Sequence, residues 1–249
     1  MRRFAVLSTI VLLAGTLAFA QKKVKSKSEL AAIQALQQAQ QAGDADGIIK
    51  AADDLITKYA DTEFKGYALG VEAEAYEQKG DHAKAIVFGE QALAADPKAY
   101  STDTLLANIY ANTTRDTDLD KEEKLAKAEK YAHDGIDAVM AAPKPNPQIT
   151  DAQWEDAKKN EEAQAYQALG TAALVRKKYD DAMADFQKGV DLNPDPVIMI
   201  RAGRALLVAR KPEEAIQWFD KAAASPLAHA QIKQIAASDK TRAQAMIKK

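Results

Sequence analysis

Small and apolar residues recur at helical spacing along most of the chain, in paired stretches separated by a short polar turn. The clearest pair lies in residues 166–194, where the turn is Lys177-Lys178. Its two stripes contain Leu169, Gly170 and Ala173 before the turn and Ala182, Phe186 and Gly189 after it. Residues at such spacings lie on one face of a helix. The pattern therefore predicts two short amphipathic helices folded back on each other.

The same arrangement recurs in three further stretches. Its residues there are Ala73, Tyr76, Ala85, Phe88 and Ala92; Ala107, Tyr110, Ala128 and Gly135; and Gly203, Leu206, Ala215, Phe219 and Ala222. In every copy a small residue follows the central alanine after seven positions, as Gly189 follows Ala182. Seven residues are about two helical turns. Each such pair therefore predicts a line of close backbone approach between helices.

The copies repeat with a period of 33 to 34 residues, with Leu169-Gly170 near the start of the clearest copy, Asn193-Pro194 at its end and Asp96-Pro97 at the end of an earlier copy. This pattern resembles the tetratricopeptide repeat family. The resemblance covers roughly residues 28–228. It implies an all-α fold, a right-handed superhelical solenoid of antiparallel helix pairs with about five repeats and a C-terminal capping helix. The competing interpretation is an alanine-rich helical bundle with accidental periodicity.

The repeat frame divides the chain into six segments. We expect a signal peptide at 1–20, a flexible leader at 21–28, repeats 1–3 at 29–141, a Pro-rich linker at 142–150, a long helix with repeats 4–5 at 151–228, and a capping helix at 229–249. Ser28 is expected to cap the first helix. The linker predicts a break between two halves of the solenoid, because its prolines prevent helix formation.

The third repeat contains an insertion at about 112–122, since 18 residues separate Tyr110 from Ala128 where the other copies have nine. Insertions in solenoids usually form exposed loops. Asp116, Asp118 and Asp120 alternate there as in the first half of a calcium-binding loop. Lys121 and Lys127, however, replace the glycine and the closing glutamate of such a loop. A solvated acidic segment is favoured over a metal site.

Two features mark the long helix after the linker. Thr150 and Gln153 have the spacing of a capping box, which predicts a helix start there and an end near Arg176. Trp154 lies on the extension of this helix ahead of the fourth repeat. It is expected to pack against the preceding repeat, with a partner contact as the alternative.

The amino terminus has the composition of an export signal. Arg2 and Arg3 precede an uncharged apolar run that ends in Ala18-Phe19-Ala20, the small-x-small pattern read by signal peptidase. We expect cleavage near Ala20 and a periplasmic or secreted mature protein. The alternative is an uncleaved membrane anchor, the only form in which we expect membrane contact.

Composition limits the other classes of function. The formal net charge is −2, which indicates neither a nucleic-acid partner nor an acidic membrane surface. The chain has no cysteine, and its three histidines, His82, His133 and His229, lie far apart. No spacing typical of a metal site, a phosphate loop or a nucleophilic triad is present. We therefore expect no enzymatic activity, no cofactor and no metal. His82 is expected to pack at a turn.

The family resemblance also implies a partner-binding groove lined by the first helix of each repeat. The corresponding residues are Gln37, Gln41, Glu74, Glu77, Asn108, Asn112, Gln167, Thr171, Arg201 and Arg204. This groove is acidic or amide-rich early and basic late, which favours an oriented peptide. The alternative is that these positions are ordinary solvated helix faces. The family subtype that clamps a terminal carboxylate is disfavoured, because Gly70 and Glu74 stand where a lysine and an asparagine are needed.

These observations predict a non-enzymatic scaffold of the cell envelope or periplasm that binds a protein or peptide partner in the groove. Two alternatives stay open. One is a structural module that self-assembles into a homo-oligomer through its repeat ends or the Trp154 segment. The other is an accessory subunit of an envelope enzyme complex.

Overall fold

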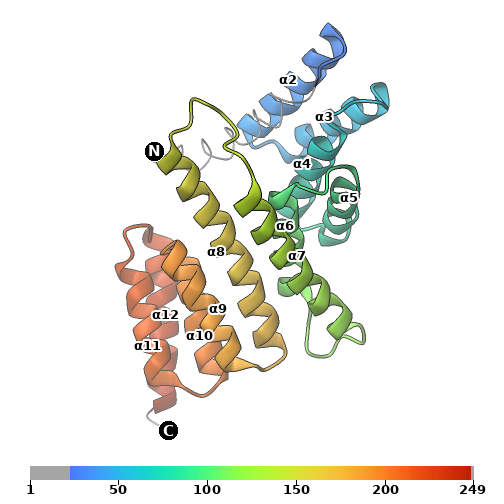
Figure 1. Ribbon diagram of the computed structural model, residues 1–249. Coiled ribbons are helices and arrows are strands. Elements are labelled where there is room, and N and C mark those ends of the chain that lie inside the picture. Colours follow the sequence, from blue (N-terminus) through green and yellow to red (C-terminus); the bar gives the residue numbers. More distant parts are fainter. Residues whose placement is uncertain (1–22, 248–249) are drawn as a thin grey trace. The chain divides into compact units, whose positions relative to one another are not determined.

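The computed structural model describes residues 23–247, and within this range every regular element is a helix (Figure 1). The helices are α2 (Lys27–Ala42), α3 (Ala45–Lys58), α4 (Lys65–Gln78), α5 (His82–Ala95), α6 (Tyr100–Thr113), α7 (Lys121–Ala141), α8 (Asp151–Val175), α9 (Tyr179–Leu192), α10 (Pro196–Val208), α11 (Pro212–Ala224) and α12 (Ala230–Ile247). The all-α prediction is confirmed. The expected signal segment and cleavage site lie outside the described residues, which include no helix long and apolar enough to cross a membrane.

Local sequence signals fix most helix starts. Asp44, Asp81 and Asp195 each accept a hydrogen bond from a backbone N–H of the helix that follows, as N-cap residues do. The predicted capping box is present: the Gln153 N–H donates to Thr150 Oγ1 at 3.2 Å, and the Thr150 N–H donates to Gln153 Oε1 at 2.9 Å. α8 then runs to Val175, one residue short of the predicted end.

The first helix starts two residues earlier than predicted. Its N-cap is Ser26, not Ser28, because the Ser26 hydroxyl accepts from the Glu29 N–H at 3.0 Å. The preceding residues contact the chain near residue 62 rather than standing free. The Lys23 N–H donates to Glu63 at 2.9 Å, and Lys25 Nζ donates to Asp61 Oδ2 at 2.6 Å. The backbone of Lys23 and the side chain of Lys25 are therefore bonded to the connection between α3 and α4, in contrast to the expected flexible leader.

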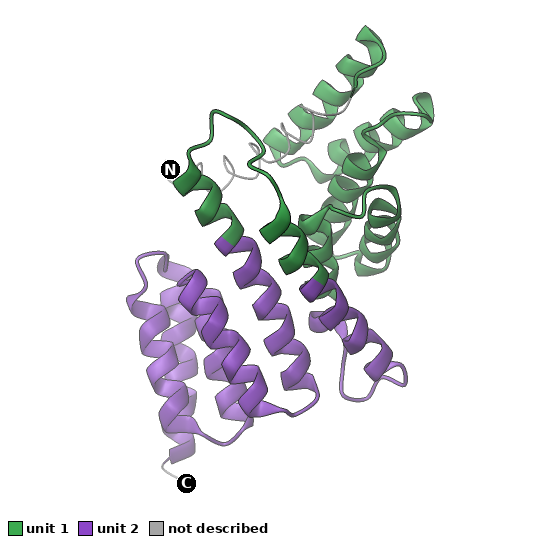
Figure 2. Cartoon of the chain, in the orientation of Figure 1, with its two compact units in different colours: residues 1–109, 134–158 green, residues 110–133, 159–249 purple. Residues whose placement is uncertain are grey.

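The chain forms two compact units, residues 1–109 with 134–158 and residues 110–133 with 159–249, which we call unit 1 and unit 2 (Figure 2). The sequence predicted the break between halves at the Pro-rich linker, residues 142–150. The structure instead divides within α6, α7 and α8. The prolines end α7 and separate it from the start of α8, but the chain passes from one unit into the other within these two helices.

Unit 1 contains a core from α2, α3 and α4, built on Leu36, Leu55, Phe64 and Ala68. The central alanine of its second pair, Ala85, is fully buried, as the repeat predicted. Trp154 is also buried within this unit, with its ring centroid 6.4 Å from that of Tyr100. The expected packing role of Trp154 is thus confirmed.

One buried group in unit 1 was not foreseen. Glu72 of α4 is 0% exposed, and among the described residues neither of its carboxylate oxygens has a hydrogen-bond partner. Burial raises its pKa to about 8, and repulsion from Asp53 contributes, whereas Lys84 acts in the opposite direction. Glu72 immediately precedes Ala73, at the position that Leu106 and Leu169 occupy in other copies. A carboxyl group therefore fills a packing position.

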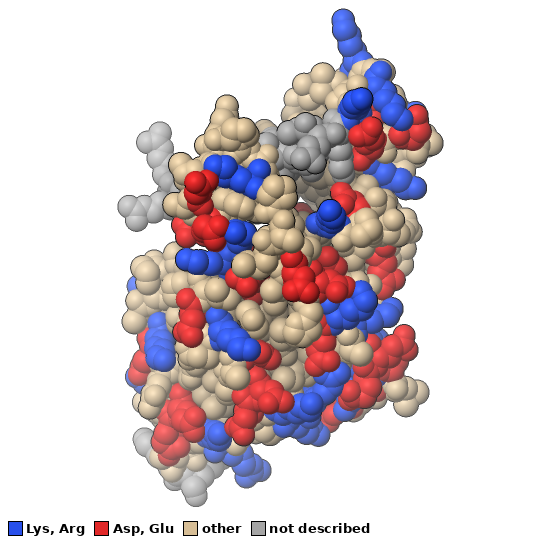
Figure 3. Space-filling view, in the orientation of Figure 1, with Lys and Arg blue, Asp and Glu red and all other residues tan. Residues whose placement is uncertain are grey.

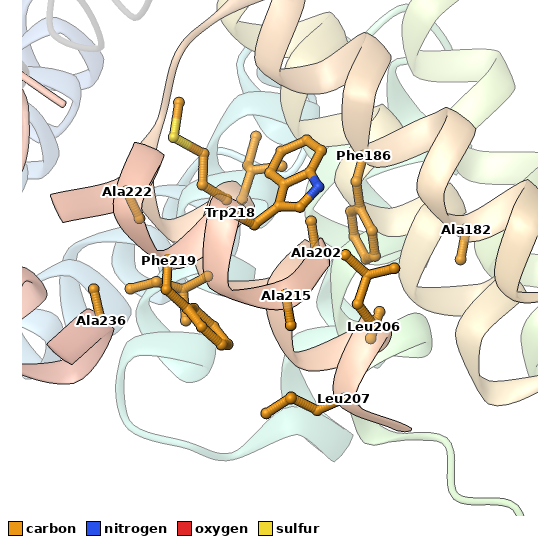
Figure 4. Packing of buried hydrophobic residues seen from close by; sticks show 14 of the residues in the cluster. Ala182, Phe186, Ala202, Leu206, Leu207, Ala215, Trp218, Phe219, Ala222 and Ala236 are labelled. Carbon is orange, nitrogen blue, oxygen red and sulfur yellow. The ribbon is translucent and has the colours of Figure 1, made fainter. Parts of the chain in front are cut away.

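Unit 2 contains a core to which α8, α9, α10, α11 and α12 contribute, built around Phe186, Leu206 and Phe219 (Figure 4). The alanines and glycines of the repeat lie at its helix crossings. A Cβ built on Gly203 would lie 2.5 Å from the Phe219 ring, and one built on Gly170 would lie 3.1 Å from the Ala182 carbonyl oxygen. Ala182 and Ala215 are fully buried. The predicted lines of close approach are confirmed.

The insertion in the third repeat is only partly a loop. Residues 114–120 connect α6 to α7, but the remainder extends α7, which begins two turns before Ala128. α5, α9 and α11 begin only one turn before their alanine. The run of Lys121 to Leu125 continues the helix because lysine, glutamate and leucine all have high helix propensity.

The inserted segment is tied to the turn after α8 within unit 2. Arg176 pairs with Glu122 through Nε at 2.8 Å and with Glu129 through Nη1 at 2.5 Å. Lys177 pairs with Asp116 at 2.8 Å. These ion pairs anchor the longer α7 to the fourth repeat.

The C-terminal helix, α12, packs on the last repeat, as expected of a capping helix. Ala236 is buried, and Ile232 and Ile235 pack against the unit 2 core. Met246, by contrast, is exposed, and Ala243 is buried near that end of the helix. Met246 lies one residue before the end of α12, past Ala243, the last buried residue of the helix.

Candidate interaction surface

The described part of unit 2 contains a cavity of about 410 Å³, which we call the α10 cavity. Its lining comes from α8, α9, α10 and α12 and consists of Thr171, Leu174, Phe186, Val197, Ile200, Arg201, Arg204, Ile232 and Ile235. Phe186 and Ile200 are buried and form its inner wall, while Val197 and Arg204 are exposed at its rim. The cavity is therefore an apolar hollow with two guanidinium groups at the opening.

Three of the predicted groove residues meet at this cavity. Thr171 lies on α8, and Arg201 and Arg204 lie one turn apart on α10. Thr171 donates its hydroxyl hydrogen to the Gln167 carbonyl at 2.8 Å, so Gln167 lies one turn away along α8. Asn112 Oδ1 accepts from Arg201 Nη1 at 2.5 Å. Five of the ten predicted residues thus belong to one neighbourhood of unit 2.

The two arginines at the cavity differ in how far their positive charge is compensated by neighbouring groups. Arg204 Nε donates to Asp239 Oδ2 at 2.7 Å. Arg201 is half-buried, and its hydrogen-bond partner, Asn112, is neutral. Burial lowers the pKa of Arg201, Arg204 lowers it further, and only the more distant Asp195 acts to raise it. Desolvation of this cation is thus incompletely offset within the described chain.

The other predicted groove residues lie in unit 1. Gln37 and Gln41 are on α2, Glu74 and Glu77 on α4, and Asn108 on α6. Glu77 Oε2 lies 2.6 Å from Nδ1 of His82, whose ring is exposed rather than packed as the sequence predicted. Asn108 donates to the Thr104 carbonyl of its own helix at 3.0 Å. None of these five residues lines the α10 cavity.

The acidic stretch of the insertion already carries its own counter-charges. Asp116 pairs with Lys121 at 3.1 Å as well as with Lys177, and Asp120 pairs with Lys124 at 2.9 Å. Within residues 23–247 no group of three histidine or acidic side chains is arranged to hold a metal ion. Lysine ammonium groups occupy the space beside these carboxylates, which favours the solvated acidic segment over a cation site.

Sequence reasoning missed the apolar part of the cavity. Ile232 and Ile235 were assigned to the cap, and Leu174 and Val197 were not singled out. The repeat identifies equivalent positions in complete helix pairs. Within the described residues no second helix follows α12, so its side chains were not compared with those of the groove. The i, i+3 spacing of Ile232 and Ile235 was the available signal.

Charged residues of both signs are interspersed over the face shown in Figure 3. This agrees with the small formal net charge of −2. Electrostatic guidance of a partner therefore depends on local groups such as the arginines of α10 rather than on the net field of the chain.

Comparison with solved structures shows the fold. A thermophilic TPR protein of Thermus thermophilus, TTC0263, superposes with a TM-score of 0.60 at 16% identity, covering 85% of this chain and 98% of that one. MamA, residues 41 to the end, of Desulfovibrio magneticus RS-1 has a TM-score of 0.57 at 15% identity, covering 80% and 95%. No model of a known protein family matches the sequence, and no curated protein sequence matches it. The chain thus has the tetratricopeptide repeat fold, and the predicted resemblance is confirmed at that level.

Proposed function

We propose that this protein is a non-enzymatic scaffold that binds a protein or peptide partner along the helices carrying the predicted groove residues. The α10 cavity is the observation that carries the proposal. Thr171 and the two arginines come from different repeats and meet at one hollow with apolar walls. Binding sites commonly combine such walls with a few placed polar groups.

Partner capture tests the proposal. The mature chain is used as bait in an envelope extract, and the wild type is compared with a Glu74→Lys, Arg204→Glu variant that reverses a charge in each unit. Glu213→Lys with Arg210→Glu is the matched control, since both residues are exposed and neither belongs to the groove set. We expect the groove variant to lose a partner that the control retains. Equal recovery by all three proteins contradicts groove binding.

The self-assembling alternative loses part of its basis, because Trp154 is packed inside unit 1 and its ring does not project from the surface. Exposed repeat ends are the remaining route to a homo-oligomer. Light scattering over a wide concentration range separates the two functions, since a strict monomer at high concentration contradicts self-assembly. Catalytic activity that copurifies with the chain, and is absent from the chain alone, supports the third alternative, an accessory subunit.

The location of this scaffold in the periplasm or outside the cell rests on residues 1–20. The basic start, apolar run and Ala18-Phe19-Ala20 ending support export and cleavage. Intact-mass measurement of the protein recovered from the periplasmic fraction tests both points. A mature start near Gln21 is the expected result, and a full-length chain retained in the cytoplasm contradicts it.

A further inference from the structure

The chemistry of the α10 cavity indicates what kind of partner segment it accepts. Its volume, about 410 Å³, lies in the range of roughly 300–1,000 Å³ typical of ligand sites. Leu174, Phe186, Ile200, Ile232 and Ile235 supply apolar walls from four helices. A bulky aliphatic or aromatic side chain entering this space would replace water against apolar surface, which is favourable.

The opening of the cavity adds a requirement for charge. All nine lining residues are neutral or basic, and among the described residues no carboxylate lies within ion-pair distance of the Arg201 guanidinium. Arg204 uses Nε for Asp239, and a guanidinium has five N–H donors in all. A carboxylate placed at the rim would compensate Arg201 and could also accept from Arg204, with the short, strong hydrogen bonds of charged pairs.

The rim also offers a hydrogen-bond acceptor to a peptide backbone. The Thr171 hydroxyl donates to its own helix, at the Gln167 carbonyl, and its oxygen can still accept. A backbone N–H beside the buried side chain can therefore donate to Thr171, while a neighbouring acidic side chain reaches Arg201 on the adjacent helix. A donor on α10 and an acceptor on α8, both in the lining of an apolar hollow, match a chain segment better than a small amphiphile.

Building on the proposed function, we propose that the α10 cavity binds an internal partner segment in which a bulky apolar residue stands next to an aspartate or glutamate. The apolar side chain enters the space between α8, α10 and α12, and the carboxylate pairs with Arg201. This differs from capture of a terminal carboxylate, because the apolar side chain and the flanking acid carry the recognition.

A displayed library of random dodecapeptides, each fused at its carboxyl end and thus without a free terminal carboxylate, tests the proposal on the mature chain. We expect enriched sequences to share a bulky apolar residue adjacent to Asp or Glu. Fluorescence anisotropy with the best peptide then compares variants. Arg201→Glu should weaken binding at least about tenfold, because it replaces an attractive contact with a repulsive one. Ile235→Trp, which fills the cavity, should weaken binding similarly.

Arg210→Glu is the matched control, an exposed arginine of the same unit that does not line the cavity. It should leave the affinity unchanged, and thermal unfolding should show that each variant stays folded. No enrichment, enrichment without the apolar-acidic pair, or equal loss with Arg210→Glu overturns the proposal. If the cellular partner is lost with Glu74→Lys but retained with Arg201→Glu and Ile235→Trp, the scaffold function stands and this assignment fails. If none of the variants loses a partner, the scaffold function itself is refuted.

Discussion

Replacing Glu72 by leucine should stabilise the protein, and the gain should grow with pH. The Glu72 carboxyl is 0% exposed, and both of its oxygens lack a hydrogen-bond partner within residues 23–247. Leu106 and Leu169 occupy the same position in other copies of the repeat. Asp53 of α3 repels the ionised form and Lys84 of α5 attracts it, but burial is the largest cause of the raised pKa. Leucine has a similar size and requires no hydrogen bond.

The size of the effect follows from linkage. The pKa of Glu72 rises from 4.5 to about 8 on folding, and each pKa unit corresponds to about 1.4 kcal/mol. The folded state thus holds a proton that the unfolded state releases, so stability is greatest below pH 4.5 and is lost as pH rises through about 8. The loss amounts to about 3 kcal/mol at pH 7 and approaches about 5 kcal/mol above pH 8.

Urea unfolding followed by circular dichroism between pH 5 and pH 9 measures this difference. The gap in unfolding free energy between Glu72→Leu and wild type should widen by several kcal/mol across that range. Glu213→Leu is the control, since Glu213 is exposed and its substitution should change the unfolding free energy little. A constant gap between Glu72→Leu and wild type would show that the carboxyl group is solvated and that the reasoning is wrong.

Three further substitutions test the packing and the turns. Ala182→Leu should cost about 1 to 3 kcal/mol, measured by urea unfolding, because Ala182 is fully buried at the crossing with Gly170; no loss would place Ala182 in solvent. Gly80→Ala should cost about 1 kcal/mol, measured by the same assay, because Gly80 has a φ of 75° in otherwise open space; an unchanged midpoint would contradict that backbone conformation. Arg176→Ala should lower the midpoint temperature of thermal unfolding and speed amide exchange at the start of α7, because it removes two ion pairs; an unchanged exchange rate would show that these pairs do not hold the helix start.

The repeat predicted most of the fold because its signals are local and recur. Small residues seven positions apart fix the helix crossings, and those crossings are buried as expected at Ala85, Ala182 and Ala215. The Thr150–Gln153 capping box could also be recognised in the sequence, since both partners lie within one turn. The start of α2 could not be predicted, because Ser26 and Ser28 can both act as an N-cap and only the backbone geometry selects between them.

Features that depend on distant residues escaped prediction. Glu72 is on a helix that reads as amphipathic in sequence, and its burial results from α3 and α5 packing on either side. The inserted sequence is compatible with a loop as well as with the observed extension of α7. The pairing of Arg176 with Glu122, 54 residues away, cannot be predicted from local spacing. In both cases the tertiary neighbours decide the state of the side chain.

The candidate site depends both on signals that recur along the chain and on contacts between residues far apart in the sequence. Gln167 and Arg201, like Thr171 and Arg204, are one period apart, so the stacking of repeats alone brings α8 and α10 groove residues together. The apolar wall of the hollow depends in addition on Ile232 and Ile235 of α12, the helix that follows the last helix pair. Because the cap closes one wall, a substitution on α12 should alter binding at Arg201 without changing the repeat. The proposed binding site therefore takes its lining from the terminal helix as well as from the repeated ones.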